Sequence, residues 1–377
     1  MKIYLFLPLL LLGCQNKQPE RIGHSADEKS TAEPMQWVTY QAKDNAKDKH
    51  IVLVSGDEEY RSEEALPQLA KILTYHHGFD CTVLFAQDPQ KPGLIDPNYS
   101  YNIPGLAQLK DADLMILFTR FRALPSEQMQ HIENYLSAGK PLVAIRTATH
   151  AFNFDQDSQH PFKHYAYNYK GENTAWHLGF GKRVLGETWY NHHGHHKHQS
   201  TRGIIAPGAE HHPIVNGIND GAIWGPSDVY GIRQPIGGDA QTIVLGQTID
   251  REGPFDEQDT FYGMRESDKI IANKRQQDTS YNPNETMPPI VWTKPYQIPG
   301  GKTGQSLTST IGAATDMVDE EVRRMFVNAT YYLLALEVPQ KAKVDIIGKY
   351  EPSAFKFQDD DYWEKRQLKV LDFVEDY

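Results

Sequence analysis

The chain has 377 residues, 39% of them hydrophobic and 23% charged, which suits a globular protein of one large domain or two smaller ones. Its 38 Lys and Arg against 49 Asp and Glu give a formal net charge of -11. Because contacts with phosphate groups need a basic surface, this charge argues against nucleic acid as a partner.

The first residues resemble a bacterial lipoprotein signal. Lys2 precedes an apolar run over residues 3–12, which is too short to cross a bilayer as a helix. The motif LLGC, which ends at Cys14, is similar to the lipobox, in which the cysteine is lipidated. We expect residues 1–13 to be a signal peptide and Cys14 to carry a lipid anchor; an ordinary signal peptide is the alternative. By resemblance to Gram-negative lipoproteins, Gln15 favours the outer membrane, facing the periplasm or the cell surface.

The composition changes twice along the rest of the chain. Residues 14–48 are polar with little apolar pattern and predict a flexible tether. Residues 49–338 are expected to form one α/β domain, and residues 339–377 a C-terminal tail with an acidic run. With Cys14 committed to lipid, Cys81 has no disulfide partner, and we expect it to be buried as a small hydrophobe.

Strands and helices alternate along the first part of this domain. Apolar runs predict strands at residues 51–54, 81–85, 114–118 and 142–145. Apolar side chains at helical spacing predict helices at residues 63–77 and 125–138. Later strands are expected at residues 242–245, 289–293 and 306–311, and a closing helix at 319–336. This pattern is typical of a doubly wound α/β fold, a mostly parallel sheet with helices on both faces.

Three of the predicted strands run directly into polar side chains. The segments that follow them are SGDEEYR (residues 55–61), TRFR (119–122) and RTATH (146–150). In open α/β sheets ligands bind at the carboxyl ends of the strands, so we expect these segments to converge on one site. The alternative at each position is an ordinary polar loop after a buried strand.

This predicted site offers acid/base and hydroxyl-binding groups. His150 with Asp57 or Glu59 is expected to form an acid/base pair, since proton transfer needs a group whose pKa lies near the operating pH. Arginine presents a rigid fork of donors that suits sugar hydroxyls, and aromatic rings can stack on sugar faces. The predicted substrate-binding residues are Arg61, Arg120, Arg146, Thr147, Trp176, His177, Tyr190 and His193. For each arginine, an ion pair with the first-loop carboxylates is the alternative.

Residues 192–198, with the sequence HHGHHKH, hold five histidines in seven positions. Imidazole is the commonest protein ligand for metal ions, and histidine-rich tracts can bind metal. The candidate ligands for a divalent metal such as zinc are His192, His193, His195 and His196. The spacing matches no standard zinc pattern, so an adventitious surface site, ordinary packing, and pocket lining without metal all remain open.

Several segments, in their order and spacing, resemble the trehalose-utilisation (ThuA-like) family over residues 49–338. They are residues 54–61, 142–150, 184–196, 289–293 and 309–312. The resemblance implies a class I glutamine amidotransferase-like fold, a role in carbohydrate use and a small-molecule carbohydrate as partner. It leaves the oligomeric state open.

The chain departs from the related folds in two places. Amidotransferases place a nucleophilic cysteine on a strained turn after a central strand, where this chain has Arg146, Thr147 and Ala148. This difference excludes glutamine hydrolysis by a Cys–His pair. Many relatives carry Gly-His near the closing strand, where this chain has Gly312 and Ala313. We therefore expect an extracytoplasmic lipoprotein enzyme that acts on a sugar or keto-sugar derivative by acid/base chemistry. The alternatives are a non-catalytic carbohydrate-binding lipoprotein and a metal-dependent hydrolase that uses the histidine tract.

Overall fold

A mixed β-sheet organises the described part of the chain, which in this computed structural model comprises residues 1, 33–43, 45–155, 157–275 and 279–374. The strands are β1 (Trp37–Tyr40), β2 (His50–Gly56), β3 (Asp80–Phe85), β4 (Leu114–Thr119), β5 (Leu142–Ile145), β6 (Asn191–His192), β7 (Gln199–Ile205), β8 (Ile223–Gly225), β9 (Tyr230–Gly231), β10 (Gln241–Asp250), β11 (Ile270–Ile271), β12 (Pro289–Tyr296) and β13 (Gly304–Ser309). The α-helices are α1 (Ser62–Tyr75), α2 (Ser126–Ser137), α3 (Glu320–Leu333) and α4 (Asp360–Arg366). The short helices are η1 (Leu106–Lys110), η2 (Arg146–His150), η3 (Lys163–Tyr165), η4 (Thr174–Trp176), η5 (Gly181–Leu185), η6 (Pro213–Val215), η7 (Asp316–Val318) and η8 (Val370–Phe373).

The strand order confirms the doubly wound α/β fold. Among the described residues, the main sheet has 11 strands in the order β1-β3-β2-β4-β5-β13-β12-β10-β7-β8, with β11 paired to β10. The run from β3 to β13 is parallel, as predicted for the β-α-β pattern. Antiparallel strands extend the sheet on both sides of this parallel centre.

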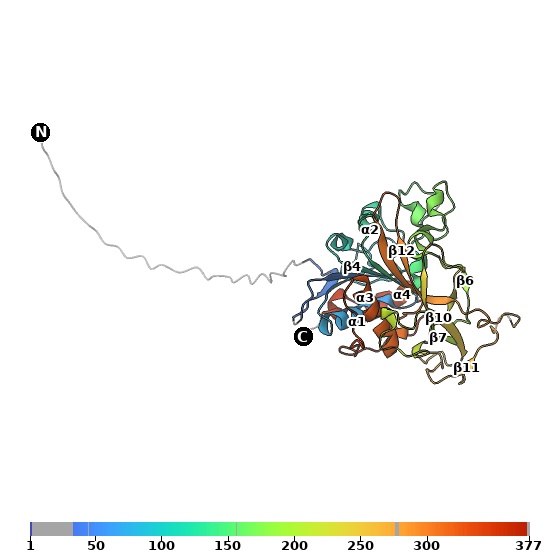
Figure 1. Cartoon of the computed structure of the whole chain (residues 1–377). Helices are drawn as coiled ribbons and strands as arrows, with labels where there is room; N and C mark the ends of the chain where they lie inside the picture. Colours follow the sequence, from blue (N-terminus) through green and yellow to red (C-terminus); the bar gives the residue numbers. More distant parts are fainter. Residues whose placement is uncertain (2–32, 44, 156, 276–278, 375–377) are drawn as a thin grey trace, which may run out of the picture. The chain divides into compact units, whose positions relative to one another are not determined.

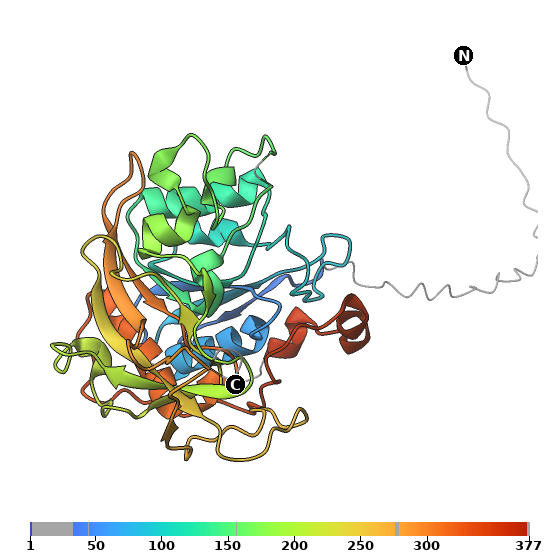
Figure 2. The ribbon, with the colours of Figure 1, turned by 90° about the vertical axis from the view of Figure 1, so that its right-hand side faces the viewer.

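The central strands are covered on both faces, which explains their unbroken apolar sequences. In β2, Ile51 and Leu53 pack in the same cluster as α1 and α3, whereas Val52 and Val54 pack with α2 on the opposite face. Figures 1 and 2 show the sheet between these two helical layers. Successive side chains of a strand point to opposite faces, so each strand supplies both cores.

Local sequence signals set the end of helix α2 and the start of helix α3. Helix α2 ends before Gly139, whose φ of +68° suits glycine, and a Cβ there would lie 2.5 Å from the Thr303 carbonyl oxygen. The chain then enters β5 and turns directly into η2. Helix α3 begins after Asp319, whose Oδ1 accepts a hydrogen bond from the Val322 N–H at 2.8 Å.

The fold begins earlier and ends later than the sequence suggests. Strand β1 lies within residues 14–48, the predicted tether, but pairs with β3 from Trp37 opposite Leu84 to Tyr40 opposite Cys81. The tether prediction is therefore wrong for this strand. The predicted tail is packed, with Phe355, Trp363 and Val370 buried.

The structure leaves the predicted membrane anchor untested. Cys14 and the signal-peptide residues, apart from Met1, lie outside the described residues. In the part of the chain that is described, no helix is both long enough and apolar enough to cross a membrane.

Candidate functional site

The carboxyl ends of β2, β4 and β5 open into one cavity of about 470 Å³. Each predicted polar segment contributes to its wall, with Glu59 from the first, Arg120 from the second and His150 from the third. Further lining comes from Trp189, the histidine-rich segment, β9 and the C-terminal segment. The last three contribute His192, His195, His196, Lys197, Tyr230, Lys356 and Phe357. The structure therefore brings together the polar groups that the sequence places at three separate strand ends.

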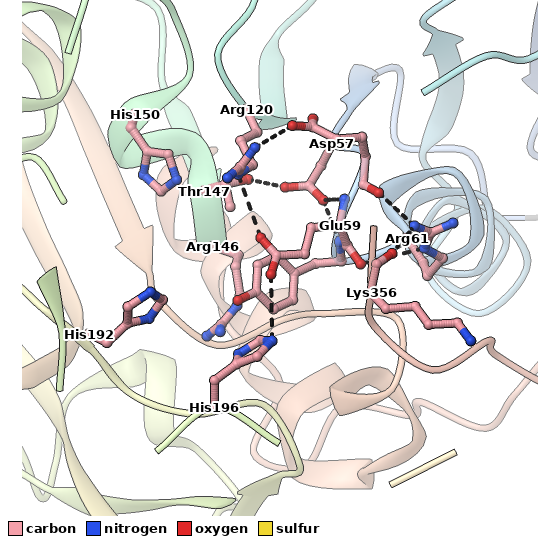
Figure 3. Close-up of polar contacts among 12 residues, drawn as sticks. Asp57, Glu59, Arg61, Arg120, Arg146, Thr147, His150, His192, His196 and Lys356 are labelled. Carbon is pink, nitrogen blue, oxygen red and sulfur yellow. Dashed lines mark hydrogen bonds and ion pairs between the residues drawn. The ribbon is translucent and has the colours of Figure 1, made fainter. Parts of the chain in front are cut away.

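Glu59 occupies the centre of the charged wall, between a histidine and an arginine. Its Oε1 lies 3.6 Å from His196 Nε2, and its Oε2 lies 3.6 Å from Arg120 Nε (Figure 3). Burial raises the pKa of Glu59 to about 7, although His196 and Arg120 act in the opposite direction. A carboxyl group that titrates near neutral pH can both accept and donate a proton.

His196 is held from behind by a buried carboxylate. Its Nδ1 lies 2.9 Å from Asp228 Oδ1, and the Asp228 side chain is only 1% exposed. Burial opposes the imidazolium form, but Asp228 and Glu59 outweigh it, so the pKa of His196 is raised. Burial likewise opposes ionisation of Asp228, but His196 and Arg146 lower its pKa. The sequence offered His196 as a metal ligand or as a pocket-lining residue, and it gave no signal for Asp228, which reaches the site through tertiary packing.

Asp57 supports the loop and does not line the cavity. Its Oδ1 accepts hydrogen bonds from the backbone N–H groups of Glu59, at 2.8 Å, and Tyr60. Its Oδ2 accepts a 2.5 Å hydrogen bond from the Thr147 hydroxyl group, which does line the cavity. The predicted catalytic role of Asp57 is corrected to that of a positioning residue, because both of its oxygens are already engaged.

His150 lines the cavity within a cage of aromatic rings. Its ring centroid lies 5.0 Å from that of Phe121 and 5.5 Å from that of Trp189. Burial, with nearby positive charges, lowers the pKa of His150 well below its ordinary value. Within the described chain, no hydrogen bond or ion pair joins His150 to Asp57 or Glu59, so the predicted acid/base pair does not form (Figure 3).

Two of the predicted substrate-binding arginines are structural. Arg61 and Arg146 are each 1% exposed and have left-handed φ angles of 60° and 47°. Such backbone strain persists only where surrounding contacts fix it. The Arg61 Nη2 donates to the Lys356 carbonyl oxygen, and Arg146 Nη1 donates to those of Asp228 and Thr310 at 2.9 and 2.6 Å. Neither side chain lines the cavity, which corrects both predictions.

Arg120 lines the cavity and also forms ion pairs. It pairs with Glu58 and approaches Glu59, while the neighbouring Arg122 lies 2.6 Å from Glu58 Oε2. The alternative stated for the arginines, ion pairs with the first-loop carboxylates, therefore describes this part of the site. Arg120 still presents its guanidinium group at the cavity wall, between the rings of Phe121 and Phe357 at 4.5 and 4.9 Å.

Several predicted substrate-binding residues lie elsewhere. Trp176 is buried in the aromatic cluster beside α2, and His177 is exposed, with its Nε2 2.9 Å from a backbone carbonyl oxygen. Tyr190 is 44% exposed and does not line the cavity, whereas the preceding Trp189 does. Of the three aromatic residues that the sequence offers for stacking on a sugar, Trp176, Trp189 and Tyr190, Trp189 alone lines the cavity.

The histidine tract does not assemble a metal centre. Among the described residues, no group of three or more His, Cys, Asp or Glu side chains is placed to hold a metal ion. His193 is buried and contacts the Tyr281 hydroxyl group and the Pro283 carbonyl oxygen, each at 2.7 Å. The other predicted ligands, His192, His195 and His196, line the cavity, which was one of the alternatives.

The C-terminal segment forms part of the wall, which the sequence did not indicate. Phe355 is fully buried, stacks on Tyr60 with ring centroids 5.6 Å apart, and packs edge-on against His196 at 5.2 Å. Two residues further on, Phe357 lines the cavity and is 55% exposed.

These features define a doubly wound α/β protein with a cavity at the carboxyl ends of its parallel strands, the edge at which open α/β sheets bind ligands. No protein-family model matches the chain, and no curated protein matches it. Its structural neighbours include ThuA-like proteins from Bacteroides uniformis and Parabacteroides merdae, each 14% identical to it. The match with the Bacteroides uniformis protein covers 77% of this chain and 92% of that protein, with a TM-score of 0.44. The match with the Parabacteroides merdae protein covers 82% of this chain and 97% of that protein, with a TM-score of 0.43.

Proposed function

We propose that this protein is an enzyme that binds a sugar or keto-sugar derivative in the cavity and transfers a proton to or from it. The observation that carries the proposal is the position of the Glu59 carboxylate, which lies at the cavity wall between Arg120 and a histidine paired with a buried aspartate. The rings of Phe121, Trp189 and Phe357 offer apolar faces of the kind that sugar rings pack against.

In this proposal Glu59 is the proton-transfer residue. Proton abstraction beside the carbonyl group of a keto-sugar needs a base whose pKa lies near the working pH, and the pKa of Glu59 is about 7. Arg120 and His196 stabilise the ionised carboxylate, and Asp228 holds the His196 ring with Nε2 toward Glu59. Asp57 and Thr147 fix the loop that carries Glu59.

The test is a screen of the purified protein against disaccharides and keto-sugars, with and without a chelator. We expect turnover of at least one compound, unaffected by the chelator and reduced about 10²- to 10⁴-fold by Glu59→Gln. The matched control is Glu351→Gln, which alters a glutamate whose side chain is 73% exposed. Turnover that survives Glu59→Gln would contradict the assignment, and sugar binding without turnover would favour the non-catalytic alternative.

We also propose that the protein acts at the cell envelope, anchored to the outer membrane by lipid on Cys14. The support is the LLGC motif followed by Gln15. Cys14→Ser should release the protein from the membrane fraction and abolish incorporation of labelled fatty acid. Retention of both properties in this variant would overturn the anchor.

A further inference from the structure

Two hydroxyl groups connect the His150 ring to the backbone of the β5–η2 turn. The Tyr230 hydroxyl group donates to the Arg146 carbonyl oxygen and lies 2.8 Å from Thr149 Oγ1. Thr149 Oγ1 in turn lies 3.2 Å from His150 Nδ1. Both hydroxyl-bearing residues are buried, at 4% exposure for Tyr230 and 0% for Thr149.

The protons of this chain of hydrogen bonds can be assigned, because each hydroxyl group has one proton to donate. A carbonyl oxygen can only accept, so the Tyr230 proton is committed to Arg146. Thr149 must then donate to the Tyr230 oxygen, which leaves Thr149 Oγ1 as an acceptor toward His150. The proton on the His150 ring therefore resides on Nδ1.

The other ring nitrogen is open to the cavity. His150 lines the cavity, and in the described chain its Nε2 has no hydrogen-bond partner and is not among the buried unpartnered atoms. Burial, together with the nearby Arg120, Arg146 and His192, lowers the pKa of His150 and so disfavours a second proton on the ring. A neutral imidazole with Nδ1–H has an unshared electron pair on Nε2 and can accept a hydrogen bond there.

We propose that Thr149 and Tyr230 hold His150 as the neutral Nδ1–H tautomer, so that Nε2 accepts a hydrogen bond from a hydroxyl group of the ligand. This inference deepens the proposed function and rests on it for the sugar. It makes His150 a selector for hydroxyl donors, and a carboxylate, which offers only acceptor oxygens, is disfavoured at this position. Thr149 and Tyr230 act through His150 and are positioning residues.

The tautomer can be read without any substrate, by nitrogen-15 NMR of the full-length protein labelled at histidine. The His150 signals are assigned as those missing from the His150→Gln spectrum. At neutral pH we expect the pattern of a neutral ring with Nδ1 protonated and Nε2 bare. Thr149→Val removes the acceptor and should shift the ring toward Nε2–H, whereas Thr149→Ser keeps the hydroxyl group and should preserve the pattern. A wild-type ring with Nε2 protonated would overturn the tautomer assignment.

The acceptor role is tested by titration with trehalose as a hydroxyl-rich probe and acetate as an anionic one. We expect trehalose, but not acetate, to move the His150 Nε2 resonance. Thr149→Val should weaken trehalose binding by about 10- to 100-fold relative to Thr149→Ser. An Nε2 resonance that trehalose leaves unchanged would overturn the acceptor role. A shift with trehalose but no turnover of any sugar would remove the proposed enzyme activity and leave this inference standing.

Discussion

His196 and Asp228 are joined by a 2.9 Å contact between Nδ1 and Oδ1 that spans 32 residues of sequence. The Asp228 carboxylate also forms an ion pair with Arg146, whose Nη2 lies 3.4 Å from Oδ1. Asp228 thus holds an imidazole group that faces the cavity and a guanidinium group that lies in the core.

We expect Asp228→Asn to lower the pKa of His196, because the lost negative charge no longer favours the imidazolium form. NMR titration of the imidazole measures this shift. The same variant leaves the buried Arg146 without its carboxylate and should cost about 3–5 kcal/mol in the free energy of unfolding. His192→Gln is the control variant. His192 Nδ1 also lies near Asp228, at 3.9 Å from Oδ2, but the His192 side chain is 59% exposed. An unchanged pKa of His196 in Asp228→Asn would contradict the role of the pair.

The rate of the proposed reaction should depend on the ionisation of Glu59. If Glu59 accepts the proton, kcat/KM should rise as the pH increases through about 7, where the carboxyl group ionises. The residual rate of Glu59→Gln should lack this limb of the profile. If the rise in kcat/KM near pH 7 persists in Glu59→Gln, a group other than Glu59 is responsible for it.

Glu58 neutralises two arginines, and its removal should destabilise the fold. We expect Glu58→Gln to cost about 3–5 kcal/mol in urea denaturation, because Arg122 is 1% exposed and loses its charged partner. The control is Glu351→Gln, which breaks a 2.7 Å pair with Lys349 between side chains that are 73% and 77% exposed. That change should cost less than about 1 kcal/mol. Equal costs for the two variants would mean that the buried pair contributes no more than an exposed one.

The two phenylalanines of the C-terminal segment should separate stability from binding. Phe355→Ala empties a fully buried position beside Tyr60 and His196 and should cost about 3–5 kcal/mol in the free energy of unfolding. Phe357→Ala removes a ring that is 55% exposed at the cavity, so it should leave stability nearly unchanged and raise KM. Wild-type affinity in Phe357→Ala would exclude this ring from the ligand contacts.

Asp319 predicts a pH-dependent stability. Burial raises its pKa from 3.8 to about 7, although its hydrogen bond with the Val322 N–H acts in the opposite direction. The folded state therefore retains a proton that the unfolded state has released, and stability falls as the pH rises from about 4 to 7. Asp319→Asn keeps the N-cap without the charge, so it should be more stable than wild type at pH 8 and similar at pH 4. Asp319→Ala, which loses the cap, should be destabilised at both pH values in the same urea titrations.

The parallel half of the sheet could be predicted from the sequence because its strands are buried on both faces. Continuous apolar runs such as residues 114–118 and 142–145 have few alternatives, and glycines such as Gly139 mark the ends of helices. Strand β7 was missed because its first residues, Gln199, Ser200 and Thr201, are polar yet buried. Its position depends on pairing with β10, which no local pattern reports.

The candidate site could be predicted only at the level of segments. The strand ends that carry Glu59, Arg120 and His150 were identified because parallel strands align their carboxyl ends. Which side chains face the cavity was not predictable, since this depends on distant partners. Arg146 turns into the core toward Asp228 and Thr310, whereas Glu59 lines the cavity opposite His196.

The pairing of β1 with β3 has a practical consequence. A shortened chain that began at residue 49 would leave β3 at the border of the sheet, with the backbone N–H and C=O groups opposite Trp37–Tyr40 unpaired. An unpaired edge strand of this kind can form hydrogen bonds with a strand of another molecule. Such a shortened protein should self-associate and precipitate, whereas one that begins at Pro34 should stay monodisperse.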